Sequence, residues 1–238
     1  MNVIITGASK GMGRKIAEKF AANNHNLFLC ARSEVQLYKT VEELLLMYPG
    51  VTIKAMPADL GERAEVAKFG EWVLAQTARI EEGKPDVLVN NAGQFIPGSI
   101  HNEDEGVLET LMQVNLLSAY HLTRLLLPPM MERKSGHIFN MCSIASLNAY
   151  KNGGAYSISK YALLGFSKNL REEMKEFGIK VTAVMPGAVY TDSWSGTGVS
   201  PQRIMESEDI AELVFAASQL SAQAVVEEIV VRPQLGDL

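Results

Sequence analysis

Cysteine and histidine are scarce in this chain. Two cysteines occur in 238 residues, Cys30 and Cys142, and both lie in apolar, strand-like segments far apart in the sequence. This scarcity excludes a disulfide-stapled fold and predicts two reduced, buried thiols, as is usual in a cytoplasmic protein. The four histidines do not have the spacing of metal ligands, so we expect no metal site.

Long apolar runs and clusters of positive charge are also missing. No hydrophobic stretch approaches the ~18 residues of a membrane span, which argues against a membrane protein. The net charge is −5, and no run of lysine and arginine marks a nucleic-acid surface. The first apolar run begins within a few residues of Met1. We therefore expect no signal peptide and a cytoplasmic location.

The composition that remains is typical of one globular domain. Hydrophobic residues make up 47% of the chain and charged residues 21%, which excludes a disordered protein. A single α/β domain commonly has about this length. No internal repeat or linker divides the sequence, so we expect residues 1–238 to form a single domain.

Short apolar runs alternate with longer helical patterns throughout. Strands are predicted at Val3–Thr6, Asn26–Ala31, Thr52–Ala55, Val87–Asn90, His137–Cys142, Lys180–Met185 and Glu228–Arg232. Helices are predicted near 12–23, 34–47, 62–80, 104–133, 155–177 and 207–220. This alternation predicts parallel pairing through right-handed crossovers. The expected fold is α/β: a single Rossmann-type, doubly wound sheet of seven parallel strands with helices on both faces.

A glycine-rich turn joins the first predicted strand to the first predicted helix. Its glycines let the backbone approach a pyrophosphate at the helix N-terminus, where N–H groups and the helix dipole hold negative charge. The spacing, G-x-x-x-G-x-G, differs from the commoner G-x-G-x-x-G fingerprint and from the P-loop. The residues expected to bind a dinucleotide here are Gly7, Ser9, Lys10, Gly11, Met12 and Gly13.

The same turn also fits G-x-S-x-G, the nucleophile elbow of serine hydrolases. The turn follows the first predicted strand, where no oxyanion loop is expected upstream. No Asp and His follow in convincing positions. A dinucleotide site is therefore the better interpretation.

The end of the second predicted strand bears on the choice of dinucleotide. An acid there would bind the ribose 2′-hydroxyl of NAD, whereas an arginine suits the 2′-phosphate of NADP. Ala31 stands in place of the acid, Arg32 follows it, and Lys10 adds a second cation. Arg32 could instead be a surface residue before a helix capped by Ser33. The two cations and the missing acid favour NADPH over NADH.

Tyr156 and Lys160 are four residues apart in a predicted helix. They would therefore share one face, with roughly 5–6 Å between Cβ atoms. An ammonium there would lower the pKa of a phenol that ordinarily titrates at about 10, and so make it an acid usable at neutral pH. By itself the pattern also suits an amphipathic helix with a solvated lysine, so the interpretation depends on the other motifs.

Taken in order, the motifs resemble those of the short-chain dehydrogenase/reductase family. The resemblance rests on Thr6–Gly13, Asn90–Gly93, Ser143 and Tyr156-x-x-x-Lys160, and it covers essentially the whole chain. It implies an NADP(H)-dependent oxidoreductase acting on a small-molecule carbonyl. The implied catalytic residues are Asn115, Ser143, Tyr156 and Lys160. The further implied cofactor contacts are Asp59, Leu60, Asn91, Ala92, Gly93, Tyr156, Lys160, Pro186, Gly187, Val189 and Thr191.

The resemblance also implies a role for each catalytic residue. Tyr156 would protonate the carbonyl as hydride arrives from the nicotinamide, and Ser143 would hydrogen-bond the carbonyl oxygen. Lys160 would lower the pKa of Tyr156 and bind the nicotinamide ribose. Asn115 would hold a water that relays protons to Lys160. Because asparagine is a poor helix former, its place in an apolar helical segment also suggests a functional reason.

The substrate is less well defined by the sequence. The segment Pro186–Trp194 and the Arg-Pro…Gly-Asp tail resemble those of bacterial sepiapterin-reductase-like members of the family. Trp194 would then stack on a flat ring and Asp237 would bind the guanidine-like edge of a pterin. Alternatively, Trp194 covers the cofactor and Asp237 is solvated. A 3-oxoacyl-carrier-protein reductase, a general short-chain alcohol dehydrogenase and an NADP-sensing binding protein are the other candidates.

Two further expectations concern a loop and assembly. The segment Thr191–Ser207 is rich in Ser, Gly and Pro, and we expect a lid there rather than a plain surface loop. The predicted helices 104–133 and 155–177 carry apolar residues beyond one face, and family members usually pair through these two. A homodimer or homotetramer is therefore expected.

Overall fold

The computed structural model describes residues 1–80, 83–191, 194 and 198–237. Within them the strands form one seven-stranded, all-parallel sheet in the order β3-β2-β1-β4-β5-β6-β7. This confirms the predicted fold class. The strands are β1 (Asn2–Thr6), β2 (Asn26–Ala31), β3 (Ile53–Pro57), β4 (Val87–Asn90), β5 (Gly136–Met141), β6 (Ile179–Pro186) and β7 (Glu228–Val231).

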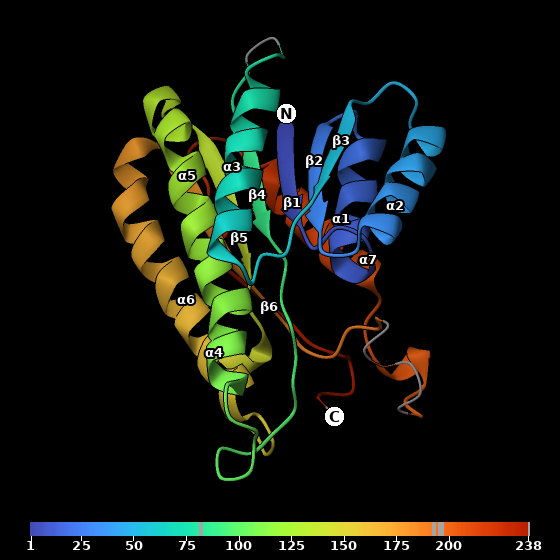
Figure 1. The fold of residues 1–238 in the computed structure, drawn as a ribbon, viewed down its shortest axis with the longest axis vertical. Helices are drawn as coiled ribbons and strands as arrows, with labels where there is room; N and C mark the ends of the chain where they lie inside the picture. The colour runs from blue at the N-terminus through green and yellow to red at the C-terminus, as the bar shows by residue number, and fades with distance from the viewer. Residues whose placement is uncertain (81–82, 192–193, 195–197, 238) are drawn as a thin grey trace.

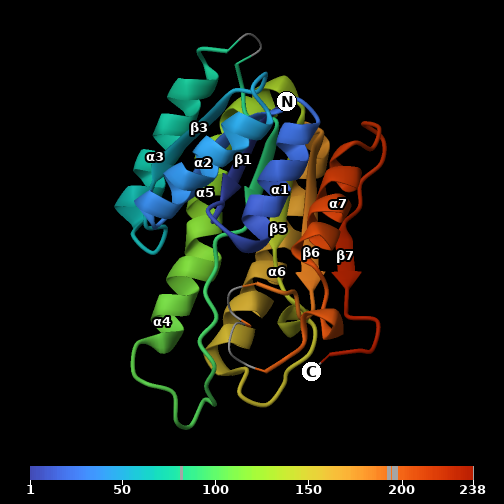
Figure 2. The same cartoon turned by 90° about the vertical axis from the view of Figure 1, so that its right-hand side faces the viewer.

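Helices cover both faces of the sheet (Figures 1 and 2). One face carries α1 (Gly11–Ala22), α2 (Glu34–Met47) and α7 (Ser207–Ser218), and the other carries α3 (Arg63–Thr77), α5 (Ser118–Arg133) and α6 (Gly154–Met174). The short helix α4 (Val107–Met112) leads into α5. Each face has its own cluster of buried apolar side chains. The sheet is thus covered on both sides, as a parallel sheet requires.

The central strands are apolar at consecutive positions because both of their faces are buried. All five residues of β1 are buried, and Val87, Leu88 and Val89 of β4 are 0–1% exposed. Neither strand therefore shows the alternation of apolar and polar residues that is typical of a strand with one face exposed to water. The parallel arrangement brings the carboxyl ends of all the strands to one edge of the sheet.

The predicted helix 104–133 differs most from what the structure shows. It begins at Val107, after Gly106 in a left-handed conformation with φ 84°. Its course is interrupted by a π-helical turn, η1 (Gln113–Leu117). Such turns insert one extra residue and often occur at functional sites. Here the turn contains Asn115, and the side chain of Asn115 is buried.

The two cysteines behave as predicted. Cys30 and Cys142 are both free and buried, and burial raises the pKa of their thiols, to about 12 and about 11 respectively. Each thiol is therefore protonated at neutral pH and is a poor nucleophile. None of the helices in the described part of the chain is long and apolar enough to cross a membrane.

Candidate active site

The predicted site residues lie at the carboxyl edge of the sheet, where the strand order reverses. The chain moves from β1 to β2 and β3 on one side, and then returns to β4 on the other side of β1. In doubly wound sheets the crevice at this switch point is the usual ligand site. The glycine turn follows β1 there, and Asn91 follows β4.

The glycine turn and the end of β4 are tied together by hydrogen bonds. Thr6 Oγ1 accepts the backbone N–H groups of Asn91 and Ala92, both at 2.9 Å. The Asn91 amide donates to the carbonyls of Thr6 (2.8 Å) and Gly7 (3.1 Å). The two predicted cofactor motifs therefore form one unit.

Two glycines in this unit have no space for a side chain. A Cβ on Gly13 would lie 2.4 Å from both Asn91 Nδ2 and Gly7 O, and a Cβ on Gly7 would lie 2.9 Å from Asn91 Nδ2. Gly7 also has φ 65° and Gly11 has φ 54°. Both values are costly for residues with a side chain. The glycines are thus required by this backbone, which leaves a bare surface at the start of α1.

The start of α1 has the features of a phosphate site. Lys10, at the N-cap, makes no side-chain cap, and the first turn contains no acidic residue. Backbone N–H groups at a helix start together with the helix dipole attract anions. Ser9 is buried, and its carbonyl accepts a hydrogen bond from Thr40 Oγ1 at 2.9 Å. The residues present therefore fit the pyrophosphate of a dinucleotide.

The adenosine end of the predicted site lies beyond β2 and β3. Arg32 is exposed directly after β2, while Ala31 beside it is buried. Leu60 is buried, and Asp59 Oδ1 accepts the N–H of Gly61 at 2.9 Å. A buried alanine thus stands where an NAD site would hold a carboxylate, and an exposed guanidinium follows it directly.

The segment after β6 returns to the glycine turn. Gly187 N–H donates to Val231 O at 2.8 Å, and Val189 forms a bridge with Met205. Thr191 ends this stretch: its Cγ2 lies 3.2 Å from where a Cβ on Gly11 would be. Thr191 therefore lies against the glycine turn, and the role of Pro186–Thr191 at the nicotinamide end stays a prediction.

Ser143, Tyr156 and Lys160 converge at the end of β5. Ser143 follows β5 and caps the short helix η2 (Ile144–Ser146) by accepting Ala145 N–H at 3.1 Å. Its hydroxyl lies close enough to that of Tyr156 to favour a lower Tyr156 pKa. Lys160 is 6% exposed, lies 5.8 Å from the Tyr156 ring centroid and donates to Met141 O at 2.7 Å. The three side chains thus lie close together.

The pKa of Tyr156 is raised overall rather than lowered, and the effect of Lys160 on it stays a prediction. Burial raises the pKa of Tyr156, the hydrogen bond with Ser143 partly opposes that shift, and nearby Cys142 adds to it. Burial also lowers the pKa of Lys160 to about 8. The lysine ammonium is directed to the Met141 carbonyl, and its charge is itself disfavoured by desolvation.

Asn115 links the loop after β4 to the helix that carries Tyr156. Its Oδ1 accepts Gln94 N–H at 2.7 Å, and its Nδ2 donates to Gln94 O at 3.0 Å and to Ser159 Oγ at 2.9 Å. A Cβ on Gly93 would lie 3.2 Å from Asn115 Oδ1 and 3.5 Å from Lys160 Nζ. Asn115 is thus next to Lys160, and its three side-chain hydrogen bonds all go to protein groups. Its predicted role in holding a water stays a prediction.

The two predicted substrate residues lie in less regular segments. Trp194 is half-buried, and its backbone N–H donates to Thr191 O at 2.9 Å. Asp237 forms an ion pair with Arg232, and its Oδ1 lies 2.8 Å from where a Cβ on Gly187 would be. Asp237 is therefore beside the predicted nicotinamide end, although Arg232 already neutralises it. Much of the predicted lid, residues 192–193 and 195–197, lies outside the described residues.

Two aromatic residues near Tyr156 were not predicted from the sequence. The Phe95 ring meets that of Tyr156 edge to face, with centroids 4.8 Å apart, and Phe95 is 50% exposed. Burial and then proximity to Tyr156 raise the pKa of Tyr150 to about 12. Phe95 lies two residues beyond the Asn90–Gly93 motif, which is the one signal in the sequence that could have pointed to it.

The site contains no metal-ligand cluster. In the residues that the structure describes, no group of three or more His, Cys, Asp or Glu side chains could hold a metal ion. The side chains present that could take part in chemistry are a serine, a tyrosine and a lysine at the end of β5.

Comparison with known sequences agrees with this arrangement. A family model described as short chain dehydrogenase matches residues 1–199. A sepiapterin reductase from Chlorobaculum tepidum is 33% identical over 244 residues, which cover 99% of this chain and 97% of that protein.

Solved structures give the same result. A metagenomic short-chain oxidoreductase in complex with NADP is 31% identical with a TM-score of 0.82, covering 98% of this chain and 97% of the other. An alcohol dehydrogenase from Thermococcus sibiricus, complexed with 5-hydroxy-NADP, is 27% identical with a TM-score of 0.88, covering 98% and 96%. A serine dehydrogenase from Escherichia coli is 28% identical with a TM-score of 0.83, and the match covers 100% of both chains.

Proposed function

The chain belongs to the short-chain dehydrogenase family, as its motifs predicted, and we propose that it is an NADPH-dependent carbonyl reductase with Tyr156 as the proton donor. The observation that carries the proposal is the convergence of Ser143, Tyr156 and Lys160 beside the crevice between β1 and β4. A protein that only bound a dinucleotide would have no need of a phenol held by a serine and backed by a buried lysine.

NADP(H) is the proposed cofactor. Arg32 is exposed at the end of β2 and Ala31 replaces the acid that would bind an unphosphorylated ribose. A guanidinium can bind a phosphate through two parallel hydrogen bonds, which suits the 2′-phosphate. Relatives solved with NADP or a derivative of it support the same assignment. The glycine turn, Asp59, Leu60, Asn91–Gly93 and Pro186–Thr191 would complete the binding surface.

The raised pKa of Tyr156 suits reduction. A phenol with a pKa above its ordinary value is protonated at neutral pH and so begins the reaction as an acid. When bound, the nicotinamide supplies the hydride. The Ser143 hydroxyl orients the carbonyl oxygen, and Tyr156 gives it a proton. Lys160, charged below a pKa of about 8, stabilises the tyrosinate that results.

The proposed substrate is a carbonyl on a flat ring, such as the side-chain ketone of a pterin. Phe95 offers a half-exposed aromatic ring at Tyr156, and Trp194 is half-buried at the end of the segment that borders the crevice. Aromatic faces favour stacking on planar groups. Asp237 would bind a guanidine-like edge only by exchanging its present partner, Arg232. The similarity to the Chlorobaculum tepidum enzyme supports the same substrate class.

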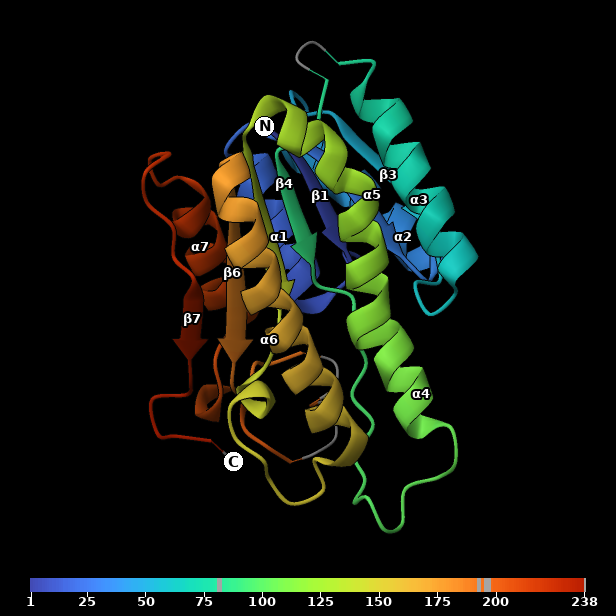
Figure 3. The same ribbon diagram turned by 90° about the vertical axis from the view of Figure 1, so that its left-hand side faces the viewer.

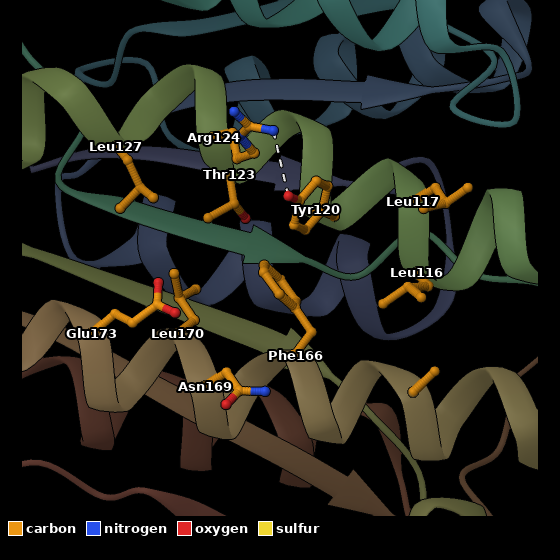
Figure 4. Close-up of a pocket in the computed structure, with 11 residues that line it drawn as sticks. Leu116, Leu117, Tyr120, Thr123, Arg124, Leu127, Phe166, Asn169, Leu170 and Glu173 are labelled. Carbon is orange, nitrogen blue, oxygen red and sulfur yellow. Dashed lines mark hydrogen bonds between the residues drawn. The ribbon is translucent and has the colours of Figure 1, made fainter.

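We also propose that the protein pairs through α5 and α6. These helices lie side by side on one face of the molecule (Figure 3), with a groove of about 610 Å³ between them. In Figure 4 aromatic and leucine side chains from both helices face this groove, with Tyr120 and Phe166 at its centre. The centroids of these two rings are 5.5 Å apart. A mostly apolar groove that also carries Arg124 and Glu173 suits the same face of a second copy, which would form a two-fold dimer.

Turnover of NADPH tests the proposed function. We expect oxidation of NADPH with sepiapterin or with the dicarbonyl 1-phenyl-1,2-propanedione. Tyr156→Phe should abolish turnover while leaving NADPH binding, followed by fluorescence, unchanged. Substantial activity in that variant would reject Tyr156 as the acid. A wild-type protein that bound NADPH but turned over no carbonyl in a broad panel, including 3-oxoacyl thioesters, would favour a sensor instead.

The cofactor is tested by exchanging the charge at the end of β2. Arg32→Asp should shift the preference, measured as the ratio of kcat/KM with NADPH to that with NADH, by at least tenfold toward NADH. Arg63→Asp, a charge change at the start of α3, is the control. An unchanged ratio in Arg32→Asp would contradict the assignment.

A further inference from the structure

The connection between β4 and α4, residues 91–106, runs beside the start of α6 (Figures 1 and 3). Two hydrogen bonds join it to the residues that precede that helix. Gly98 N–H donates to Asn152 O at 3.2 Å, and Ser99 Oγ donates to Asn152 Oδ1 at 2.7 Å. In a third hydrogen bond the side chain of Glu103 accepts an N–H group of the helix itself. This connection is therefore attached to the helix that carries Tyr156 and Lys160.

Glu103 supplies what the start of α6 lacks. The helix begins at Gly154, and its N-cap residue, Gly153, has no side chain with which to cap it. The first N–H groups of any helix need an acceptor from outside the helix. Glu103 Oε2 accepts the N–H of Ala155 at 3.2 Å, from a position 52 residues earlier in the chain. A carboxylate at this end of a helix is also favoured by the helix dipole.

The fit around Glu103 depends on two glycines. A Cβ on Gly154 would lie 2.6 Å from Glu103 Oε2 and 2.5 Å from Gly98 O. A Cβ on Gly98 would lie 3.0 Å from Glu103 Cβ. The connection and the start of α6 therefore both lack a side chain at the place where they meet. The carboxylate occupies the space that side chains at these two positions would fill.

The same connection also contacts the phenol. Phe95 packs edge to face on Tyr156, and Asn115 fixes both backbone groups of the neighbouring Gln94. Glu103 holds the helix turn on which Tyr156 stands, one residue after Ala155. One segment therefore fixes both the ring of Tyr156 and the backbone beside it.

From these contacts we propose that Glu103 is a positioning residue for Tyr156. By capping α6 it sets the position of the phenol against the wall formed by Phe95, and so aligns the proton donor with the carbonyl. The proposal rests on the proposed function. It differs from plain helix capping because a plain cap would affect the stability of the fold and leave the turnover of folded enzyme unchanged.

Three variants test the proposal: Glu103→Ala, Glu103→Gln and, as the matched control, Glu105→Ala, whose carboxylate is exposed in the same connection. With 1-phenyl-1,2-propanedione we expect Glu103→Ala to lower kcat by on the order of tenfold, because small displacements of a reacting group cost rate steeply. The NADPH dissociation constant should stay within about twofold. Glu103→Gln should recover most of kcat, since its amide oxygen can accept the same N–H. Glu105→Ala should match the wild type.

Two results would overturn the proposal. One is a Glu103→Ala protein whose Tm lies well above the assay temperature, so that it is folded, and whose kcat is within about twofold of the wild type. The other is a Glu103→Gln protein as slow as Glu103→Ala, which would mean that the accepted hydrogen bond is not what matters. Tyr156→Phe, measured alongside, separates the proposals: if it stays active, the proposed function fails, whereas an inactive Tyr156→Phe with a normal Glu103→Ala rejects only the role of Glu103.

Discussion

Replacing Asn115 with alanine should destabilise the protein and slow it at the same time. The Asn115 side chain is 1% exposed and makes three hydrogen bonds, to both backbone groups of Gln94 and to Ser159. Alanine can replace none of them. The loss would therefore leave a backbone N–H, a backbone carbonyl and a hydroxyl without this partner.

The size of the effect follows from these three bonds. A typical hydrogen bond contributes about 1 kcal/mol net, and a buried group left without a partner costs about 1–3 kcal/mol. Gln94 lies in a half-buried loop, where water can partly replace the lost partner. We therefore expect a loss of about 2–4 kcal/mol in the free energy of unfolding. Asn115→Asp should fall between alanine and the wild type, because a carboxylate can still accept the Gln94 N–H.

Urea denaturation followed by circular dichroism, at one fixed protomer concentration, measures this difference. The control is Asn23→Ala, which removes a single exposed hydrogen bond to Lys19 O and should cost less than about 0.5 kcal/mol. The kcat of Asn115→Ala should also fall, since Gln94 leads directly into Phe95 at the phenol. A loss below about 1 kcal/mol for Asn115→Ala, with kcat unchanged, would refute the view that this side chain holds the wall of the site.

Three further predictions use the same structure. Turnover in the reductive direction should fall as pH rises through about 8, because Lys160 loses its charge there. A pH profile of kcat that stays flat to pH 9.5, roughly a unit and a half above that pKa, would contradict this. Gly13→Ala should weaken NADPH binding at least tenfold, because its Cβ would lie 2.4 Å from Asn91 Nδ2; titration calorimetry should show no change for Gly165→Ala, whose Cβ meets nothing within 4 Å. Burial lowers the pKa of His137 from 6.5 to about 3. Protonation of this histidine therefore favours the unfolded chain. The free energy of unfolding should fall as pH drops below 6.5, by roughly 3 kcal/mol at pH 4. His137→Gln should lack this component of the acid loss when the unfolding free energy is measured against pH, and an unaltered pH dependence would show that His137 does not contribute.

The strands and the glycine turn were predictable because their patterns are local. A central parallel strand is buried on both faces, so Val87–Val89 are consecutively apolar. Gly7 has a positive φ of 65°, and a Cβ on Gly13 would meet Gly7 O in the same turn. Both glycines also lie against Asn91 at the adjacent strand end. The interruption of the long helix at 113–117 was not predictable, because the π-helical turn there accompanies contacts that Asn115 makes with residues 21 and 44 positions away.

The residue types of the site were likewise predictable, but their electrostatics were not. Tyr156 and Lys160 share a helix face by their spacing alone. The pKa of each, however, depends on how deeply other elements bury it, and burial shifts Tyr156 upward and Lys160 downward. The direction in which the Lys160 ammonium points was set by a carbonyl at the end of β5, at Met141.

The order of strands and helices along the chain, the glycine turn that suits a pyrophosphate, and the identities of Ser143, Tyr156 and Lys160 could all be read from the amino-acid sequence. The charge states of these groups and the contacts that hold them depend on how the chain packs. Phe95, Glu103 and Asn115 reach α6 from segments at least 44 residues away. Such contacts depend on chain packing rather than on spacing, because desolvation and hydrogen bonding act through space between elements that the sequence keeps apart.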